Sequence, residues 1–201
     1  GAGHEDLGLP LVAQAEVRIQ VQQVEMQFFQ RAAAIKLSHA KLVAFGSTRR
    51  KGISAAEDSN LKSLLAANTE YVAIFGKSHI MHVTDVIKAT PEENLAMIYD
   101  SVKFLTENGK KVIFDAEHFF DGYKTDAEYA LGALESAHRA GAYCLCLCDT
   151  NGGIFPDEAY EITKKVTDAF PDTITAIHCH NDGGLAVASA IEAGKAGARK
   201  I

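Results

Sequence analysis

The sequence lacks the features that mark membrane, secreted or nucleic-acid-binding proteins. No apolar run reaches the roughly 20 residues that a membrane-spanning helix needs. The first residues show no basic start, apolar core and small-residue cleavage site of a signal peptide. There is no basic block, and 26 aspartates and glutamates outnumber 20 lysines and arginines, which gives a net charge of −6. These absences predict a protein with no membrane partner and no nucleic-acid partner.

Cysteine is also scarce, and the four that occur are Cys144, Cys146, Cys148 and Cys179. The first three stand at every second position of one apolar run, so their side chains share one face of a strand, where neighbours pair poorly as disulfides. The sequence therefore predicts a reduced protein of the cytoplasm. The C-x-C-x-C spacing could also suit a thiolate metal site, although small cysteines buried in a strand are the commoner case.

The composition is that of an ordinary globular protein, with 47% apolar and 23% charged residues. A chain of 201 residues is long enough for one domain with a sizeable core. Its first part is different, because it is rich in glutamine and shows only a loose alternation of Val17, Ile19 and Val21. We therefore predict an atypical N-terminal segment at residues 1–27 and one folded domain at residues 28–201.

From residue 28 onward, a helix at Phe28–Leu37 and then short apolar runs dominate the sequence. The runs are continuous rather than alternating, as expected for strands buried on both faces of a parallel sheet. Five of them have strand length: Lys41–Phe45, Tyr71–Phe75, Lys111–Phe114, Tyr143–Cys148 and Ile174–Ile177. Ala198–Ile201 resembles the beginning of one more strand.

Helical segments with recognisable ends separate these runs. Their starts match capping boxes, in which a hydroxyl residue precedes a glutamate by three positions: Ser54 with Glu57, Thr90 with Glu93, and Thr125 with Glu128. Pro91 stands at a position where a helix tolerates proline. Their stops are marked by glycines just before the next strand: Gly109, Gly141 and Gly197. The repeated order of strand, loop and helix predicts a βα array.

Two architectures close such an array, a (β/α)8 barrel and a doubly wound open sheet. No G-x-G-x-x-G motif marks a first strand–helix turn, which makes a dinucleotide-binding sheet the weaker choice. Polar residues instead follow almost every strand, at the end where barrel enzymes build their active sites. They are Ser47, Thr48 and Arg49; Lys77, Ser78 and His82; Asp115, Glu117 and His118; Asp149, Thr150 and Asn151; and His178, His180, Asn181 and Asp182.

The stretch Ile177–Gly184 carries the strongest chemical signal. His178 and His180 stand two residues apart at the end of an apolar strand, so their side chains point to the same side. Two neutral imidazoles that converge on one point suit a divalent cation. A hydrogen-bonded histidine pair without a metal fits the spacing equally well.

Longer motifs around these residues resemble the family of 2-isopropylmalate synthases and citramalate synthases, which are metal-dependent TIM-barrel acyltransferases. IHCHNDGGLAVA and LCDTNGG resemble the family's signatures, and FDAEHFFDGYKTD and GSTRRKG are most similar to the citramalate synthase branch. The resemblance covers residues 28–201. It implies an α/β fold, a partial (β/α)8 TIM barrel with roughly strands three to seven and the start of the eighth, and helices outside.

The resemblance also implies an activity, a metal-assisted Claisen condensation of acetyl-CoA with a 2-oxo acid, pyruvate above all, in isoleucine and leucine biosynthesis. It implies that His178 and His180 ligate a divalent metal, Mg²⁺, Mn²⁺ or Zn²⁺. Glu117 matches a catalytic carboxylate, and Asp115, which shares its face of the strand, is assigned to catalysis with it. The full-length enzyme would be a homodimer.

Four further residues are assigned to substrate binding. Thr150 matches a threonine that contacts the substrate, and His82 matches a histidine of the loop after the fourth barrel strand. Asn181 belongs to the H-x-H-N-D signature. Arg49 would help to hold an acidic substrate or a CoA phosphate, although a surface arginine is as common an explanation.

The sequence departs from the family at both ends. The family's first strand carries an Arg-Asp-Gly motif, whose aspartate ligates the metal, and residues 1–27 hold no such motif. The eighth strand's Gly-Glu-x-x-Gly-Asn region is missing too, so the metal site is incomplete and the chain alone should be weakly active or inactive. Two alternatives therefore remain: a non-catalytic fragment or scaffold of such an enzyme, and a 2-isopropylmalate synthase, homocitrate synthase or related lyase or aldolase.

Overall fold

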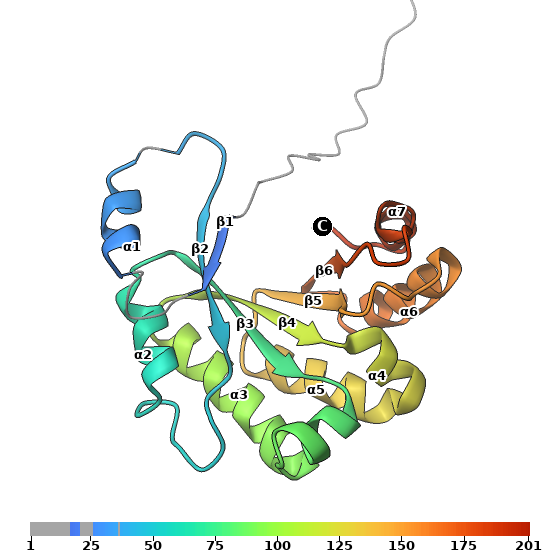
Figure 1. Ribbon diagram of the computed structural model, residues 1–201, viewed down its shortest axis with the longest axis horizontal. Coiled ribbons are helices and arrows are strands. Elements are labelled where there is room, and N and C mark those ends of the chain that lie inside the picture. Colours follow the sequence, from blue (N-terminus) through green and yellow to red (C-terminus); the bar gives the residue numbers. More distant parts are fainter. Residues whose placement is uncertain (1–16, 21–25, 36) are drawn as a thin grey trace, which may run out of the picture.

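Six parallel strands form one sheet in which the spatial order of the strands is their order along the chain (Figure 1). The computed structural model describes residues 17–20, 26–35 and 37–201. The strands are β1 (Val17–Gln20), β2 (Leu42–Ser47), β3 (Tyr71–Lys77), β4 (Lys111–Glu117), β5 (Cys144–Asp149) and β6 (Ile174–Cys179). The predicted parallel array is confirmed, because every neighbouring pair from β1 to β6 runs in the same direction.

Helices connect the strands and lie along one side of the sheet. They are α1 (Met26–Ala33), α2 (Ser59–Ala66), a π-helical turn η2 (His82–Val86), α3 (Pro91–Glu107), α4 (Phe119–Thr125), α5 (Ala127–Arg139), α6 (Pro156–Ala169) and α7 (Ala186–Lys195). In Figure 1 the sheet curves, and α3, α4, α5 and α6 follow its outer side. Within the described part of the chain, no helix is long and apolar enough to cross a membrane.

The two faces of the sheet carry two different cores. The outer core packs strand residues such as Phe114, Leu145 and Ile177 against helix residues such as Ile98 and Leu134. The inner face, turned away from the helices, has a smaller cluster made of strand residues alone: Val43, Tyr71, Ala73, Ile113, Cys144, Cys146, Cys148 and Ala176. Burial on both faces is why these strands read as continuous apolar runs. The arrangement is a partial (β/α)8 barrel.

Several strands run further than their apolar runs suggested. β3 continues from Phe75 to Lys77, and β4 continues from Phe114 to Glu117. The parallel pairing continues to the last residues of both strands, where Lys77 is the partner of Glu117. The side chains of these two residues point inward and lie at the open mouth of the curved sheet.

The helix starts were predicted correctly at one place and wrongly at two. Thr90 caps α3 as predicted, since its side chain accepts a hydrogen bond from the Glu93 amide. Asp58 caps α2, and Asp126 caps α5, one position after Thr125. At both positions the aspartate side chain accepts hydrogen bonds from backbone amides of the first helical turn. Ser54 instead begins a separate turn that precedes α2. The three predicted glycine stops are confirmed by their positive φ angles.

The two ends of the sheet extend the sequence prediction. Lys200 forms a parallel bridge with Ala176 next to β6, which confirms the strand start predicted at Ala198–Ile201. The Arg199 amide donates to the Thr175 carbonyl at 2.8 Å in the same pairing. At the other edge, β1 pairs with β2, and it lies within the predicted N-terminal segment at residues 1–27, most of which is outside the described residues.

Gly122 in α4 provides the first test of the fold. A Cβ atom at this position would lie 2.5 Å from the Ser78 carbonyl oxygen and 3.0 Å from the His79 Cα, so the backbones of α4 and the β3 loop must separate. We expect Gly122→Ala to lower the free energy of unfolding by about 1–3 kcal/mol. Gly132→Ala in α5 is the matched control, because its nearest contact is 3.9 Å and the change should stabilise by up to about 1 kcal/mol. Equal effects of both changes in urea unfolding would contradict this packing.

Asp58 gives a test that depends on pH. Its buried carboxylate accepts hydrogen bonds from the Asn60 and Leu61 amides at 2.9 and 3.1 Å, and from the Arg50 amide at 3.0 Å. Burial acts to raise the pKa of Asp58, but the hydrogen bonds from Arg50, Leu61 and Asn60 outweigh it, so that the pKa is lowered.

Because the folded state holds the ionised form, the stability that Asp58 contributes is present above its ordinary pKa and is lost as the pH falls through the lowered one. We expect Asp58→Ala to cost about 2–4 kcal/mol at neutral pH, from the lost cap and the unpaired amides. Asp58→Asn keeps an acceptor, and the advantage of the natural chain over it should shrink below about pH 4. A pH-independent difference in urea unfolding would refute the assignment.

Candidate active site

A pair of opposite charges marks the carboxyl ends of β3 and β4. Lys77 and Glu117 are register partners at the last positions of these strands, and their side chains form an ion pair. Both side chains are only partly exposed, at 19% and 26%. The Ser78 hydroxyl donates to the Glu117 carbonyl at 2.6 Å and ties the two strand ends together. Glu117 is therefore held at the mouth of the curved sheet by a lysine that the sequence prediction did not include among the site residues.

Three histidines gather beside this pair. The His82 ring lies 4.9 Å from that of His79 and 4.3 Å from that of His118, centroid to centroid. Burial lowers the pKa of His82, and the neighbouring His118, His79 and Lys77 lower it further, so the neutral ring is favoured. The predicted substrate-binding His82 is the first residue of η2, and it lies near enough to Lys77 and Glu117 for their charges to act on its ring.

Thr150 directly follows β5 and is held by the residue that directly follows β4. Its hydroxyl oxygen accepts a hydrogen bond of 2.9 Å from the amide of His118, which has a left-handed φ of 57°. Asp149 accepts hydrogen bonds from the Gly153 and Ile154 amides at 3.2 and 3.3 Å and so shapes the loop that follows Thr150. The Thr150 hydroxyl keeps its own proton as a donor, which suits the predicted contact with a substrate oxygen.

His178 in β6 and His180, the first residue after β6, point to the same side. The His178 and His180 rings lie 5.1 Å apart, centroid to centroid, and both residues are exposed. Cys179 between them packs against the outer core, and burial raises its pKa to about 12. This geometry agrees with the predicted orientations. Two imidazoles on one side of a strand end fit two positions in the coordination sphere of a divalent cation.

Asn181 lies just beyond this pair. Its side-chain oxygen accepts a hydrogen bond of 3.2 Å from the Ala186 amide, the first residue of α7. The residue is exposed and holds the loop that leads to this helix. The predicted contact of Asn181 with substrate stays a prediction.

Glu117 and His178 lie on the inner face of the sheet with one strand between them. Ile113, four residues before Glu117, and Ala176, two residues before His178, belong to the inner cluster. Because side chains alternate with period 2, Glu117 and His178 lie on the same face as these two residues. The strand spacing puts their backbones roughly 10 Å apart. A small substrate can bridge such a gap and touch both groups.

Asp115 lies deeper on the same face, two residues before Glu117. It is buried, and one of its carboxylate oxygens lies within 4.8 Å of the sulfur atoms of Cys146 and Cys148. This burial places Asp115 below the mouth of the sheet rather than at it. Asp115, Cys146 and Cys148 form the one group in the described part of the chain whose ligand atoms are close enough to hold a metal ion together.

Arg49 forms ion pairs with two acidic residues of helix α3. Its guanidinium contacts Asp100 at 2.8–2.9 Å and Glu93 at 3.0 Å, and its own amide donates to the Ser101 hydroxyl at 2.8 Å. The side chain is almost fully buried. Two carboxylates thus already neutralise this charge, which gives Arg49 a structural role in joining the end of β2 to α3. Its predicted contact with an acidic substrate remains a prediction.

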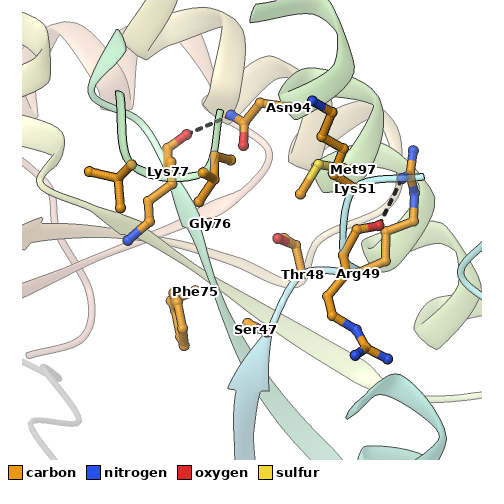
Figure 2. Close-up of a pocket in the computed structure, with 12 residues that line it drawn as sticks. Ser47, Thr48, Arg49, Lys51, Phe75, Gly76, Lys77, Asn94 and Met97 are labelled. Carbon is orange, nitrogen blue, oxygen red and sulfur yellow. Dashed lines mark hydrogen bonds between the residues drawn. The ribbon is translucent and has the colours of Figure 1, made fainter. Parts of the chain in front are cut away.

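A cavity of about 450 Å³ opens between the ends of β2 and β3 (Figure 2). Its lining includes Thr48, Lys77, Asn94 and Met97. The Asn94 side chain donates to the Lys77 carbonyl at 2.8 Å and fixes one wall. Asn94 is remote in sequence from the strand ends, so nothing in the sequence pattern indicated it.

Comparison with known proteins identifies the family of this chain. A model of the family described as HMGL-like matches residues 7–201. The (R)-citramalate synthase of Aquifex aeolicus is 54% identical over 174 residues, which are 87% of this chain and 33% of that protein. The 2-isopropylmalate synthase of Sulfurisphaera tokodaii is 31% identical over 150 residues, which are 75% of this chain and 38% of that protein.

A solved structure of similar fold is the HMG-CoA lyase of Bacillus subtilis, with a TM-score of 0.71 at 17% identity. The match covers 87% of this chain and 57% of that one, and it shows the fold alone. This chain spans about a third of the length of the curated synthases it matches. With the family model matching nearly all of its residues, the chain belongs to the HMGL-like family.

Proposed function

We propose that this chain is part of an acyltransferase of the citramalate synthase type, which condenses acetyl-CoA with a 2-oxo acid, and that the 2-oxo acid is pyruvate. The observation that carries the proposal is its 54% identity with an (R)-citramalate synthase, against 31% with a 2-isopropylmalate synthase. The histidine pair and Glu117 at the mouth of one curved sheet support it, because this chemistry needs a metal and a base close together.

In this proposal His178 and His180 hold a divalent cation. Their rings lie on one side of the strand end, 5.1 Å apart, and neutral imidazole suits Zn²⁺ and related transition-metal ions. When bound, such a cation acts as a Lewis acid that polarises the keto group and orients the 2-oxo acid. Two imidazoles alone make a weak site, with Zn²⁺ held more tightly than Mg²⁺.

Glu117 is the residue we assign to proton removal. Its carboxylate accepts a proton from the methyl group of acetyl-CoA, and the carbanion then forms a bond to the keto carbon of the 2-oxo acid. The resulting alkoxide takes up a proton, and water cleaves the thioester to release CoA. The Lys77 ammonium fixes the carboxylate through their ion pair. Thr150 and His82 offer hydrogen bonds to the oxygens of the acid.

A non-catalytic role is the second candidate, because the chain spans only a third of the synthases it matches. It would then be a fragment or scaffold with the ancestry of an enzyme. A lyase that runs the same carbon–carbon chemistry in reverse is a third candidate, for which only the fold similarity speaks.

Release of free CoA tests the activity. We expect this chain to release CoA from acetyl-CoA slowly, below about 1 s⁻¹, and only when pyruvate and Mn²⁺ are both present. Glu117→Gln removes the proposed base and should reduce the rate by about 10²–10⁴-fold. Glu135→Gln is the control, since Glu135 is exposed on α5, outside the site. The rate is measured with a thiol reagent.

Pyruvate-independent release, or a rate that Glu117→Gln leaves unchanged, would overturn the assignment. Complete inactivity of a folded chain would favour the scaffold. Cleavage of a hydroxyacyl-CoA to acetyl-CoA would favour the lyase.

Metal binding at the histidine pair is tested without turnover. Bound Mn²⁺ broadens nearby proton resonances, so we expect the His178 and His180 signals to broaden at lower Mn²⁺ concentration than that of His39. His39 is exposed in the segment before β2 and serves as the internal control. Broadening of His39 first, or of all three together, would mean that no site exists at the end of β6.

A further inference from the structure

A second group of metal-binding side chains lies on the inner face of the sheet, below the histidine pair. Asp115 on β4 and Cys146 and Cys148 on β5 each offer one ligand atom, and these atoms all lie within 4.8 Å of one another. The residues are 3%, 1% and 6% exposed. None of the three belongs to the H-x-H motif on which the proposed function depends.

The strand register brings these ligands together. Asp115 is the register partner of Cys146, so a carboxylate and a thiol meet across two neighbouring strands. Cys148, two residues further on the same face, is the register partner of His178 on β6. Its sulfur lies 4.0 Å from Nδ1 of His178. Three adjacent strands thus present a carboxylate, two thiols and an imidazole.

The distances suit a tetrahedral ion. Zinc bonds of 2.3 Å to sulfur and 2.0–2.2 Å to nitrogen or oxygen imply separations of about 3.5–3.8 Å between ligand atoms. The separation of 4.0 Å between Cys148 and His178 is close to this range. The other three atoms need to approach one another by about 1 Å or less.

The chemistry of the donors selects the metal. Two thiolates favour a borderline-soft ion such as Zn²⁺ over Mg²⁺ or Mn²⁺, which prefer oxygen ligands. A carboxylate oxygen such as that of Asp115 is also an ordinary zinc ligand. The exposed His178 end of the group provides a route of entry.

We propose that Asp115, Cys146 and Cys148 bind one zinc ion, with Nδ1 of His178 as the nearest further donor. Binding converts both thiols to thiolates and releases two protons to solvent for each ion bound. The proposal does not rest on the condensation activity. It makes Cys146 and Cys148 of β5 metal ligands, in addition to their packing in the inner cluster.

Cobalt titration of the reduced, metal-free chain tests this site. Co²⁺ replaces Zn²⁺ in tetrahedral thiolate sites and shows sulfur-to-metal charge-transfer absorption in the near ultraviolet. We expect this absorption to saturate at one Co²⁺ per chain and to disappear on addition of one Zn²⁺. Loss of a residue that only orients a metal ligand typically weakens metal binding by about 10–100-fold. Cys146→Ser and Cys148→Ser each remove a ligand, so we expect each to weaken Co²⁺ binding by roughly 100-fold or more.

Two cysteines of the same chain are matched controls. Cys144 lies on the same strand face but outside the group, and Cys179 faces the outer core. Cys144→Ser and Cys179→Ser should keep the absorption. Circular dichroism confirms that each variant is folded, and proton release by the natural chain provides a measurement that needs no variant: two protons per Zn²⁺ are expected.

Co²⁺ binding without charge-transfer absorption, or absorption that survives Cys146→Ser and Cys148→Ser, would overturn the proposal. So would release of no protons on addition of Zn²⁺. The histidine pair is judged separately, because Mn²⁺ broadening at His178 and His180 does not require the cysteines. A chain without a thiolate site can still be a synthase, and a zinc-binding chain can still lack turnover.

Discussion

The parallel register of the sheet is the constraint on which the rest of the structure depends. Because all strands run in one direction, their carboxyl ends share one rim, and side chains that alternate inward converge there. Lys77 stands beside Glu117 only because β3 and β4 are aligned at those residues. Cys148 stands beside His178 for the same reason on β5 and β6. A slip of one residue in either pair would turn these groups to the opposite face.

Charge compensation is the second organising force near this rim. Burial of a lone charge is costly, and Arg49 and Glu117 each have partners of opposite charge there. Arg49 is held by Glu93 and Asp100, and Glu117 is held by Lys77. These pairs join elements that are distant in sequence, so the same contacts that neutralise charge also fix α3 against β2 and β3 against β4.

The sequence predicted the fold better than it predicted the partners of each side chain. Parallel strands, outer helices and the orientation of His178 and His180 follow from local patterns of apolar residues and from period 2. The Lys77–Glu117 pair depends on the alignment of residues 40 positions apart, which no local pattern encodes. The caps at Asp58 and Asp126 were missed because serine, threonine and aspartate compete as N-caps within a few residues. The carboxylates around Arg49 lie on a helix some 50 residues away.

The strand order has a consequence for how the chain acquires its structure. Each strand pairs with the one made just before it, since the spatial order β1 to β6 is the order of synthesis. The strand pairings of the described residues therefore close loops of one βα unit each, which keeps the contact order of this part of the chain low for a parallel architecture. Folding can then proceed by addition of one unit at a time as the chain leaves the ribosome. At each stage the most recently formed strand is the exposed edge of the sheet, and the next strand pairs with it.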